Sequence, residues 1–132
     1  MAGLVPKTTG HLTLHSNLYG PQARFNQLLG YCPQDNPLPS NFTLSQLCRI
    51  FLWLSGDGRM AKQQRITHLL NQFKLTHIKS TPLNHLSSGV KRKVLMCLSL
   101  VKDPLVLLLD EPTSGLDEAD RKEICSILHS LK

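Results

Sequence analysis

Apolar residues recur at helical spacing through the middle of the chain and predict two amphipathic helices. The first is expected to begin at Thr43, because Thr43 and Gln46 form the T-x-x-Q pattern of a capping box. Its apolar face is predicted to consist of Leu44, Leu47, Phe51 and Leu54. Glycines at positions 56 and 58 are expected to end it. The second helix has an apolar face made of Ile66, Leu69, Leu70 and Phe73.

The two ends of the chain show strand patterns as well as helices. We predict a strand at residues 11–15, a brief helix at 22–29 and a strand over LGYC, residues 29–32. After the loop STPLNH, a third helix is predicted at 89–101, and Pro104 prevents its continuation. The apolar run LVLLLD, residues 105–110, is typical of a parallel strand covered by helices on both faces. A last helix is predicted at 118–131, so the fold class is α/β.

Composition narrows the function classes. No apolar run in the 132 residues reaches the roughly 18 residues that a membrane-spanning helix needs. The N-terminus lacks a secretory-signal pattern, so we expect the chain to stay where it is made.

The net charge of +6 is dispersed along the chain, and we interpret its densest group, residues 91–93, as a solvated helical face. Few aromatic residues are present for base stacking, which argues against nucleic acid as a partner. The four cysteines form no C-x-x-C pair and are expected to be reduced, mostly buried thiols.

Two adjacent carboxylates follow the apolar strand. Asp110 and Glu111 lie where open α/β sheets place their ligands, at the carboxyl end of a strand. An acidic residue there can hold Mg²⁺ through water, and its neighbour can accept a proton from an attacking water. Upstream, LSSG opens the third helix and offers hydroxyl groups and backbone N–H groups to an anion. The sequence therefore places phosphate-directed and metal-directed chemistry on neighbouring elements.

The ordered set GYCPQ, LSSGVKRK, LVLLLDEP and SGLD resembles the ATP-binding cassette (ABC) ATPases. In that family the corresponding parts are the Q-loop, the signature, the Walker B strand and the D-loop. GYCPQ and the KRK run resemble most the A subfamily, which contains large lipid exporters. The resemblance implies a partial P-loop NTPase (RecA-like) fold with a helical subdomain. It implies core residues at 1–34, the helical subdomain at 35–98, and core residues again at 99–132.

The resemblance also implies a role for each matching residue. Gln34 would contact magnesium or the attacking water, Asp110 would hold magnesium through water, and Glu111 would be the general base. Ser87, Ser88 and Gly89 would face the γ-phosphate of ATP held by an opposite cassette, and Asp117 would cross the interface between cassettes. The implied cofactors are ATP and Mg²⁺. The implied partners are a second cassette and a transporter's transmembrane domain, which would place the chain at the cytoplasmic face of a membrane.

The sequence departs from the family pattern at several positions. The usual double glycine of the signature is Ser88-Gly89, and the usual final glutamine is Val90. No G-x-x-x-x-G-K-[ST] phosphate loop is present, and Pro6 before Lys7 has no N–H to donate to a phosphate. The family's switch histidine is also not found, since His129 falls on the last predicted helix. We therefore expect a partial cassette of a lipid-exporting ABC transporter that is inactive alone.

Two other hypotheses remain open at this point. One is a non-enzymatic regulatory cassette fragment that pairs with an intact cassette and supplies only its signature face. The other is an ABC ATPase of the chromosome or translation type, which acts on nucleic acid. Only 52 residues separate Gln34 from Ser87, so the coiled-coil insertion of the chromosomal type is absent.

Overall fold

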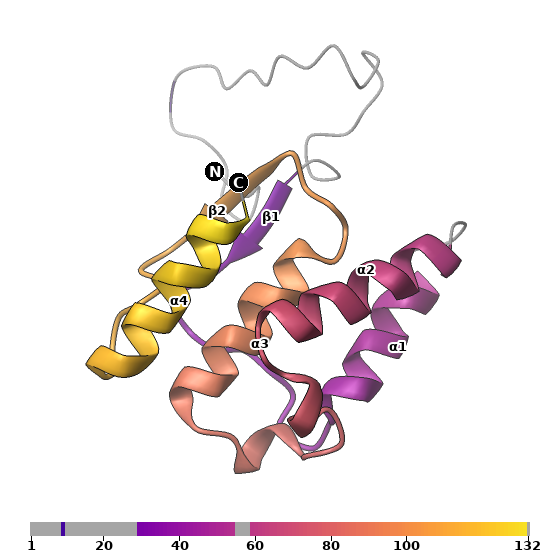
Figure 1. Cartoon of the computed structure of the whole chain (residues 1–132), viewed down its shortest axis with the longest axis horizontal. Coiled ribbons are helices and arrows are strands. Elements are labelled where there is room, and N and C mark those ends of the chain that lie inside the picture. The colour runs from indigo at the N-terminus through magenta and orange to yellow at the C-terminus, as the bar shows by residue number, and fades with distance from the viewer. Residues whose placement is uncertain (1–8, 10–28, 55–58, 132) are drawn as a thin grey trace.

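The structure, a computed structural model, describes residues 9, 29–54 and 59–131, which form a two-stranded parallel sheet and four α-helices. The predicted strand at 11–15 and most of the predicted helix at 22–29 lie outside the described residues. Leu29 belongs to the first strand. Figure 1 shows α4 beside the two strands, and α1, α2 and α3 grouped on the other side of the molecule. Among the described helices, none has the length and apolar content needed to cross a bilayer.

The sheet pairs β1, Leu29–Cys32, with β2, Val106–Leu109, in parallel. The register joins Leu29 to Val106 and Cys32 to Leu109, and the ladder continues as Asp110 N–H donates to the Cys32 carbonyl at 3.0 Å. The strands predicted at 29–32 and 105–110 are confirmed. Because the strands are parallel, their carboxyl ends meet at one edge. That edge carries the residues that follow each strand.

The burial of β2 differs from the prediction. All four of its residues are half-buried, although a strand covered on both faces was expected. Leu107 and Leu109 pack against the hydrophobic core, whereas Val106 and Leu108 alternate to the opposite face. The described residues therefore cover one face of the strand, and this partial cover explains the intermediate exposure.

The first two helices of the middle region follow the predicted capping and periodicity. In α1, Leu44–Leu54, the Thr43 N–H donates to Gln46 Oε1 at 2.8 Å and the Gln46 N–H donates to Thr43 Oγ1 at 3.3 Å, which confirms the capping box. Leu44 and Leu47 are buried, but Leu54 is 65% exposed because the core ends before the last turn of the helix. In α2, Arg59–Gln72, Ile66 and Leu69 are buried as predicted, and Phe73 is buried one residue past the helix.

The loop STPLNH contains a short 3₁₀ turn, Leu83–His85, and another, Thr76–Ile78, precedes it. Helix α3, Ser88–Leu100, follows and packs against β1. Gly30 permits this packing, since a Cβ atom at residue 30 would lie 2.6 Å from the Ser99 carbonyl oxygen. Arg65 of α2 donates from Nε to the Leu100 carbonyl at 3.0 Å and pairs with Asp103 at 2.7 Å. These contacts fix the end of α3 between α2 and the sheet.

The last helix, α4, is Glu118–Ser130, and it begins at an acidic cap. Asp117 Oδ1 accepts the Asp120 N–H at 2.8 Å, and Glu118 and Asp120 add negative charge to the first turn, where the helix dipole favours it. Ile124 and Ile127 bury its inner face in the core. His129 lies near its end, exposed, with Nδ1 2.7 Å from the Cys125 carbonyl oxygen.

Candidate functional site

Gln34 and Glu111 meet at the edge where both strands end. Gln34 Nε2 donates a hydrogen bond to Glu111 Oε2 at 3.0 Å, and both side chains are exposed. Gln34 lies two residues past β1, and Glu111 lies two residues past β2, so the parallel register brings them together. The bond engages one carboxylate oxygen. No hydrogen bond from the described residues engages the other, which can accept a proton from solvent.

The backbone at Glu111 adopts a conformation that is uncommon for a residue with a side chain. Its φ angle is +43°, in the left-handed region. The Ser114 N–H donates to the Glu111 carbonyl at 3.1 Å, which closes a turn immediately after the strand. Backbone strain of this kind costs about 1–3 kcal/mol and persists where surrounding contacts hold it. The chain therefore turns sharply at Glu111, and its carboxylate is carried on the resulting loop.

Asp110 precedes this turn and presents an exposed carboxylate. Carboxylate and amide oxygens are the ligands that Mg²⁺ prefers, and the site offers them on Asp110, Glu111 and Gln34. Within the described ranges, no cluster of three or more acidic, histidine or cysteine residues could by itself hold a metal. This donor set fits a Mg²⁺ ion that keeps several waters and is also bound by phosphate oxygens.

The predicted signature residues lie at the N-terminus of α3. Ser87 is the N-cap, and its hydroxyl oxygen accepts the Val90 N–H at 3.3 Å. Ser88 is exposed in the first turn, whereas Gly89 is buried. A Cβ atom on Gly89 would come 1.9 Å from Asp120 Oδ2, so a side chain at this position would require the Asp120 carboxylate to move. Asp117, predicted to cross an interface between cassettes, is exposed and caps α4.

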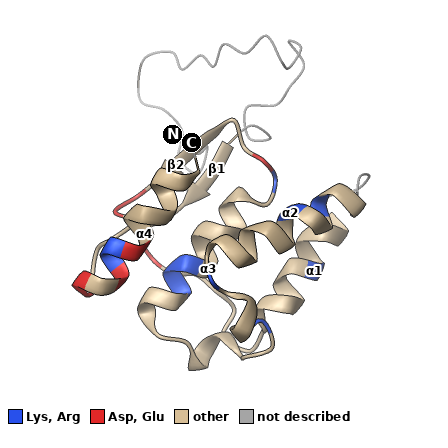
Figure 2. Cartoon of the chain, viewed as in Figure 1, with Lys and Arg blue, Asp and Glu red and all other residues tan. Residues whose placement is uncertain are grey.

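The interpretation of residues 91–93 as a solvated helical face is wrong. Lys91 is half-buried, Arg92 is 2% exposed and Lys93 is 8% exposed. The reason is that α3 lies beside both the strand ends and the acidic first turns of α4 (Figure 2), where Arg92 donates to the Glu111 carbonyl and Lys93 pairs with Asp120. Helical spacing could have revealed this, because Gly89 and Met96 lie three and four residues from positions 92 and 93 and share their buried stripe.

Lys93 joins α3 to α4 through a partly buried ion-pair network. Its ammonium forms a close ion pair with Glu123 and lies 3.3 Å from Asp120 Oδ1, and Lys74 Nζ lies 3.2 Å from Glu123 Oε1. Burial alone would lower the pKa of Lys93, but the hydrogen bonds and negative charges of Glu123 and Asp120 together raise it. The hydrogen bond from Lys93 lowers the pKa of Glu123 despite some desolvation. Both groups are therefore charged at neutral pH.

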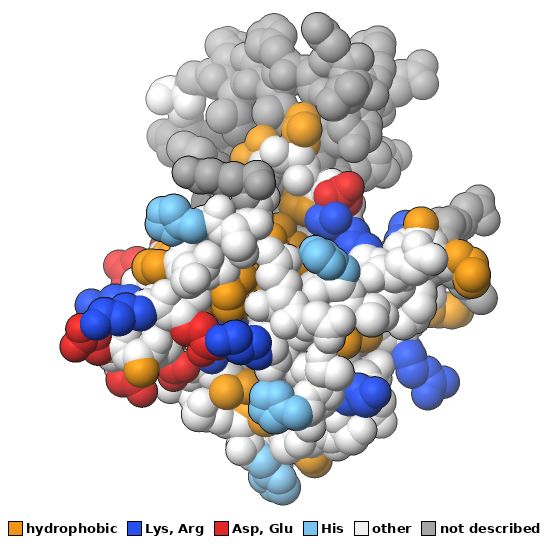
Figure 3. Space-filling view, in the orientation of Figure 1, with side chains coloured by type: hydrophobic (Ala, Val, Ile, Leu, Met, Phe, Trp, Pro, Cys, Tyr) orange, Lys and Arg blue, Asp and Glu red, His pale blue; other side chains and the backbone are white. Residues whose placement is uncertain are grey.

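Charged side chains of both signs intermix on the face seen in Figure 3, most densely over the first turns of α4. Some of the basic side chains therefore have a carboxylate beside them. Lys122 Nζ, for example, lies 2.7 Å from Glu118 Oε1. A nucleic-acid site would need a basic stripe that tracks phosphates. The described residues on this face do not form such a stripe.

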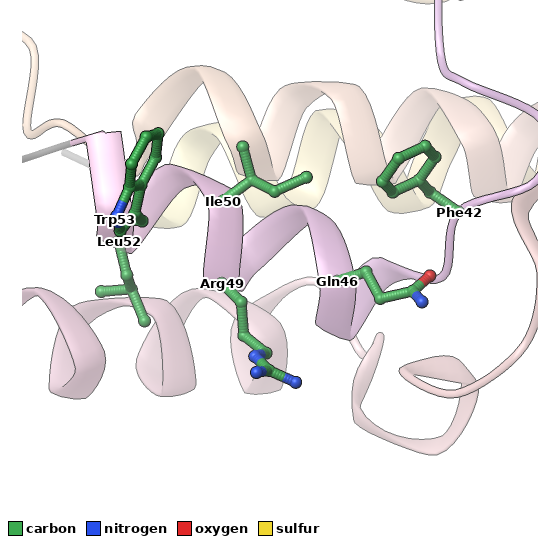
Figure 4. A pocket seen from close by; sticks show the side chains of 6 residues that line it. All are labelled: Phe42, Gln46, Arg49, Ile50, Leu52 and Trp53. Atoms are coloured by element: carbon green, nitrogen blue, oxygen red, sulfur yellow. The ribbon is translucent and has the colours of Figure 1, made fainter.

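An apolar surface lies on α1, outside the strand-end site. Phe42, Ile50 and Trp53 project along one side of the helix, with Gln46, Arg49 and Leu52 completing the hollow (Figure 4). Trp53 is 71% exposed, which is unusual for the largest apolar side chain. Sequence analysis did not predict this surface, because helical periodicity assigns only one apolar face to α1.

Comparison with known proteins identifies related sequences and structures. The family described as "ABC transporter" matches residues 1–114. Mouse "ABC-type organic anion transporter ABCA8B" is 34% identical over 131 residues, which cover 99% of this chain, and mouse "Phospholipid-transporting ATPase ABCA3" is 31% identical over 133 residues, which cover all of it. The chain spans about 8% of the length of these curated relatives.

A solved structure is similar as well. The structure of cbiO1 from Clostridium perfringens, described as part of the ABC transporter complex cbiONQ, superposes with a TM-score of 0.71 at 30% identity. The superposition covers 80% of this chain and 42% of that protein. A second solved structure, an ATP-binding subunit of an ABC transporter, has a TM-score of 0.67. Together these similarities confirm the predicted α/β P-loop NTPase fold of the ABC ATPase type.

Proposed function

Because the chain belongs to the ABC transporter family, we propose that it supplies the water-activating edge and the signature face of an ATP-binding cassette that couples ATP hydrolysis to export. The observation that carries this proposal is the Gln34–Glu111 hydrogen bond, which joins the Q-loop glutamine to the carboxylate after β2. The two residues come from separate strands and meet where an α/β sheet places its ligand. Their side chains are exposed and therefore accessible to a bound nucleotide.

Glu111 is the proposed general base. The amide of Gln34 orients its carboxylate by binding Oε2, and the second oxygen accepts the proton of the attacking water. Asp110 and Gln34 are the residues that would hold Mg²⁺, whose chemistry is to neutralise charge on the phosphate oxygens when bound. The sharp turn at Glu111 places its carboxylate beyond the strand end, separate from Asp110. The two carboxylates can therefore serve different roles.

The start of α3 is the proposed contact with ATP held by a second cassette. Ser88 is exposed there. The Ser87 hydroxyl accepts a hydrogen bond from the Val90 N–H and can still donate one to a phosphate oxygen. Gly89 has no side chain and would contribute through its backbone only. Asp120 lies where a side chain on residue 89 would have to be. The positive end of the α3 dipole favours an anion at this position. Asp117, at the start of α4, is proposed to lie at the same interface between cassettes.

The proposed setting is the cytoplasmic face of a membrane, in contact with a transporter's transmembrane domain. Support comes from cbiO1, which is described as part of a transporter complex. A lipid as the transported molecule is suggested by the relative named as a phospholipid-transporting ATPase. Since the 132 residues contain no G-x-x-x-x-G-K-[ST] sequence, we propose that hydrolysis requires a polypeptide that carries this phosphate loop.

A chimaeric cassette tests the catalytic role of Glu111. Residues 1–132 would replace the matching segment in a cassette of the mouse phospholipid-transporting relative, and phosphate release from MgATP would be measured. Glu111→Gln is expected to reduce turnover by about 10²–10⁴-fold, the usual contribution of a general base. Glu118→Gln is the matched control, because Glu118 is exposed on α4 and, among the described residues, pairs with Lys122 alone. A folded chimaera without turnover, or one that Glu111→Gln leaves unchanged, would contradict the proposal.

A mixing experiment tests the signature face. The chain would be added to a complete cassette that has its phosphate loop but a disabled signature, and turnover would be measured across a range of chain concentrations. Turnover is expected to rise with added chain and to fall again when Ser88 is replaced by Glu, which opposes the phosphate charge. The control is Glu118→Gln. Equal turnover with wild-type chain and with Ser88→Glu would contradict a contact between α3 and the phosphate.

A further inference from the structure

A buried arginine on the signature helix connects both halves of the strand-end site. Arg92 lies in the first turns of α3 and is 2% exposed. Its hydrogen bonds with the described residues all go to backbone carbonyl groups near the ends of β1 and β2. These groups, which we call the carbonyl ring, belong to Pro33, Gln34, Asp110, Glu111 and Pro112.

The geometry uses the full donor capacity of the guanidinium group. Nε donates to Pro112, one terminal nitrogen donates to Pro33 and Gln34, and the other donates to Asp110 and Glu111. The distances to the carbonyl oxygens of Gln34, Asp110 and Glu111 are 2.8, 2.7 and 2.8 Å. A guanidinium has five N–H donors in a fixed plane, so each donor has its own acceptor.

The charge of Arg92 is stabilised by dipoles and not by a carboxylate. Among the ion pairs of the described residues, none includes Arg92. A buried charge without compensation is costly, and here the compensation comes from converging carbonyl oxygens. Those oxygens would repel one another without a cation between them. The carbonyl ring and the guanidinium therefore stabilise each other, and loss of Arg92 would separate the two strand-end loops.

The ring includes the backbone of both residues that form the proposed catalytic pair. The Gln34 carbonyl accepts on one side of the guanidinium, and the Glu111 carbonyl, at the left-handed turn, accepts on the other. None of these hydrogen bonds reaches the Gln34 side-chain amide or the Glu111 carboxylate. Arg92 therefore holds the main chains that carry the two groups.

We propose that Arg92 is a positioning residue that holds the Q-loop and the Glu111 turn in register from the signature helix. The catalytic meaning of this role rests on the proposed function of Glu111. A movement of α3 would therefore shift both strand-end loops together, because the guanidinium group of Arg92 is bonded to both of them. Lysine cannot replace it, because an ammonium has three donors and lacks the planar fork.

The first experiment is NMR on the unmodified 132-residue chain. The five N–H protons of Arg92 are expected to give separate signals that exchange slowly with water, since each is buried and hydrogen-bonded. Averaged, rapidly exchanging signals would overturn the proposal. This measurement does not depend on whether any variant folds or on whether the chain takes part in ATP hydrolysis.

Hydrogen exchange of two variants provides the second experiment. Arg92→Lys is expected to raise the amide exchange of Asp110 and Ser114, whose N–H groups donate to the Cys32 and Glu111 carbonyls, by about tenfold or more, while amides inside α1 keep their rates. Arg65→Lys is the matched control, because Arg65 also donates to a backbone carbonyl but at the far end of α3. Equal effects of the two variants at the strand ends would overturn the proposal.

Chemical rescue separates positioning from simple cavity formation. In Arg92→Ala, guanidinium at millimolar concentration, far below the molar range that unfolds proteins, is expected to restore slow exchange at the amides of Asp110 and Ser114. Ethylammonium carries the same charge without the planar fork and is expected to restore little. Equal rescue by both cations, or no rescue by guanidinium, would show that the fork geometry is not needed and would overturn the proposal.

Kinetics of the chimaeric cassette complete the test. Arg92→Lys is expected to lower kcat by about 10²-fold, the effect of a misplacement of roughly 1 Å. The KM for ATP is expected to change little, since Arg92 lies behind the loops. A change confined to KM would overturn the role. If the wild-type chimaera has no turnover, the proposed function fails, while the exchange measurements on the chain still decide the positioning role.

Discussion

The carboxylate of Asp120 lies directly over Gly89, so that a Cβ atom on residue 89 would come 1.9 Å from Oδ2 and 2.4 Å from Cγ. This contact joins the start of α3 to the first turn of α4. Asp120 is also held by Lys93, whose ammonium lies 3.3 Å from Oδ1. The glycine of the signature therefore lets the Asp120 carboxylate keep its place beside Lys93, in addition to any role in binding phosphate.

Gly89→Ala is expected to destabilise the chain by about 1 kcal/mol, because Asp120 must rotate away and leave Lys93. In an Asp120→Ala background the same change is expected to be neutral or to stabilise, since alanine has the higher helix propensity by up to about 1 kcal/mol. Denaturant unfolding of the two single variants and the double variant measures this coupling. Equal effects of Gly89→Ala in both backgrounds would show that the carboxylate does not restrict residue 89.

Stability is expected to fall on acidification because of Glu123. Its folded-state pKa lies below the usual 4.5, so its ion pair with Lys93 contributes stability above that pH and loses it as the pH falls through the folded pKa. Glu123→Gln should therefore flatten the acid limb of a plot of unfolding free energy against pH. Glu118→Gln is the control, because its exposed pair with Lys122 contributes little. An acid limb that is unchanged by Glu123→Gln would refute this assignment.

One thiol of the folded chain is expected to react readily with a maleimide or an alkylating reagent. Burial raises the pKa of Cys48 to about 11 and that of Cys97 to about 12, and it also raises the pKa of Cys32, so these thiols stay protonated and inaccessible. Cys125 is exposed on α4. Mass spectrometry should find one modification before unfolding and four afterwards, and Cys125→Ser should abolish the first. Rapid modification of a second cysteine in the folded chain would contradict this burial pattern.

The 132-residue chain alone is expected to show no measurable MgATP hydrolysis and little affinity for ATP. Asp110 and Glu111 are negatively charged and attract a triphosphate only through a metal that phosphates already bind. Positioning of the phosphates by backbone N–H groups and a lysine supplies much of this catalysis, and the sequence contains no such loop. Calorimetry and a phosphate-release assay check this expectation. Micromolar ATP binding, or turnover that Glu111→Gln abolishes, would contradict it.

Local signals in the sequence predicted much of the fold. The T-x-x-Q capping box fixed the start of α1, and the proline at 104 marked the region where α3 ends. The strand pattern of LGYC predicted β1 and the apolar run after Pro104 predicted β2, whereas the parallel pairing of the two strands and the contact of Gln34 with Glu111 were seen only in the structure. Each of the predicted features depends on residues close together in sequence, which is why sequence alone was sufficient for them.

The burial of Arg92 and Lys93 was not predicted, and the reason is physical. A cation inside a protein requires oxygen acceptors, and the acceptors of Arg92 come from residues 33–34 and 110–112, far from it in sequence. Those of Lys93 come from α4. A pattern of charges on one helix carries no information about carbonyl groups on distant loops. The exposure of Leu54 was missed for a similar reason, since periodicity does not indicate how far the core extends.

The parallel pairing of β1 with β2 has a consequence for the order of folding. All of α1, α2 and α3 lie between the two strands in the sequence, so the pairing of β1 with β2 closes a long loop. Because closing this loop costs conformational entropy, we expect the strands to pair late in folding. Helices with local contacts form first, and they shorten the distance that the strands must span. The Gln34–Glu111 contact therefore assembles only after the helical region has packed, and variants that slow helix packing should delay the formation of the site more than that of any helix.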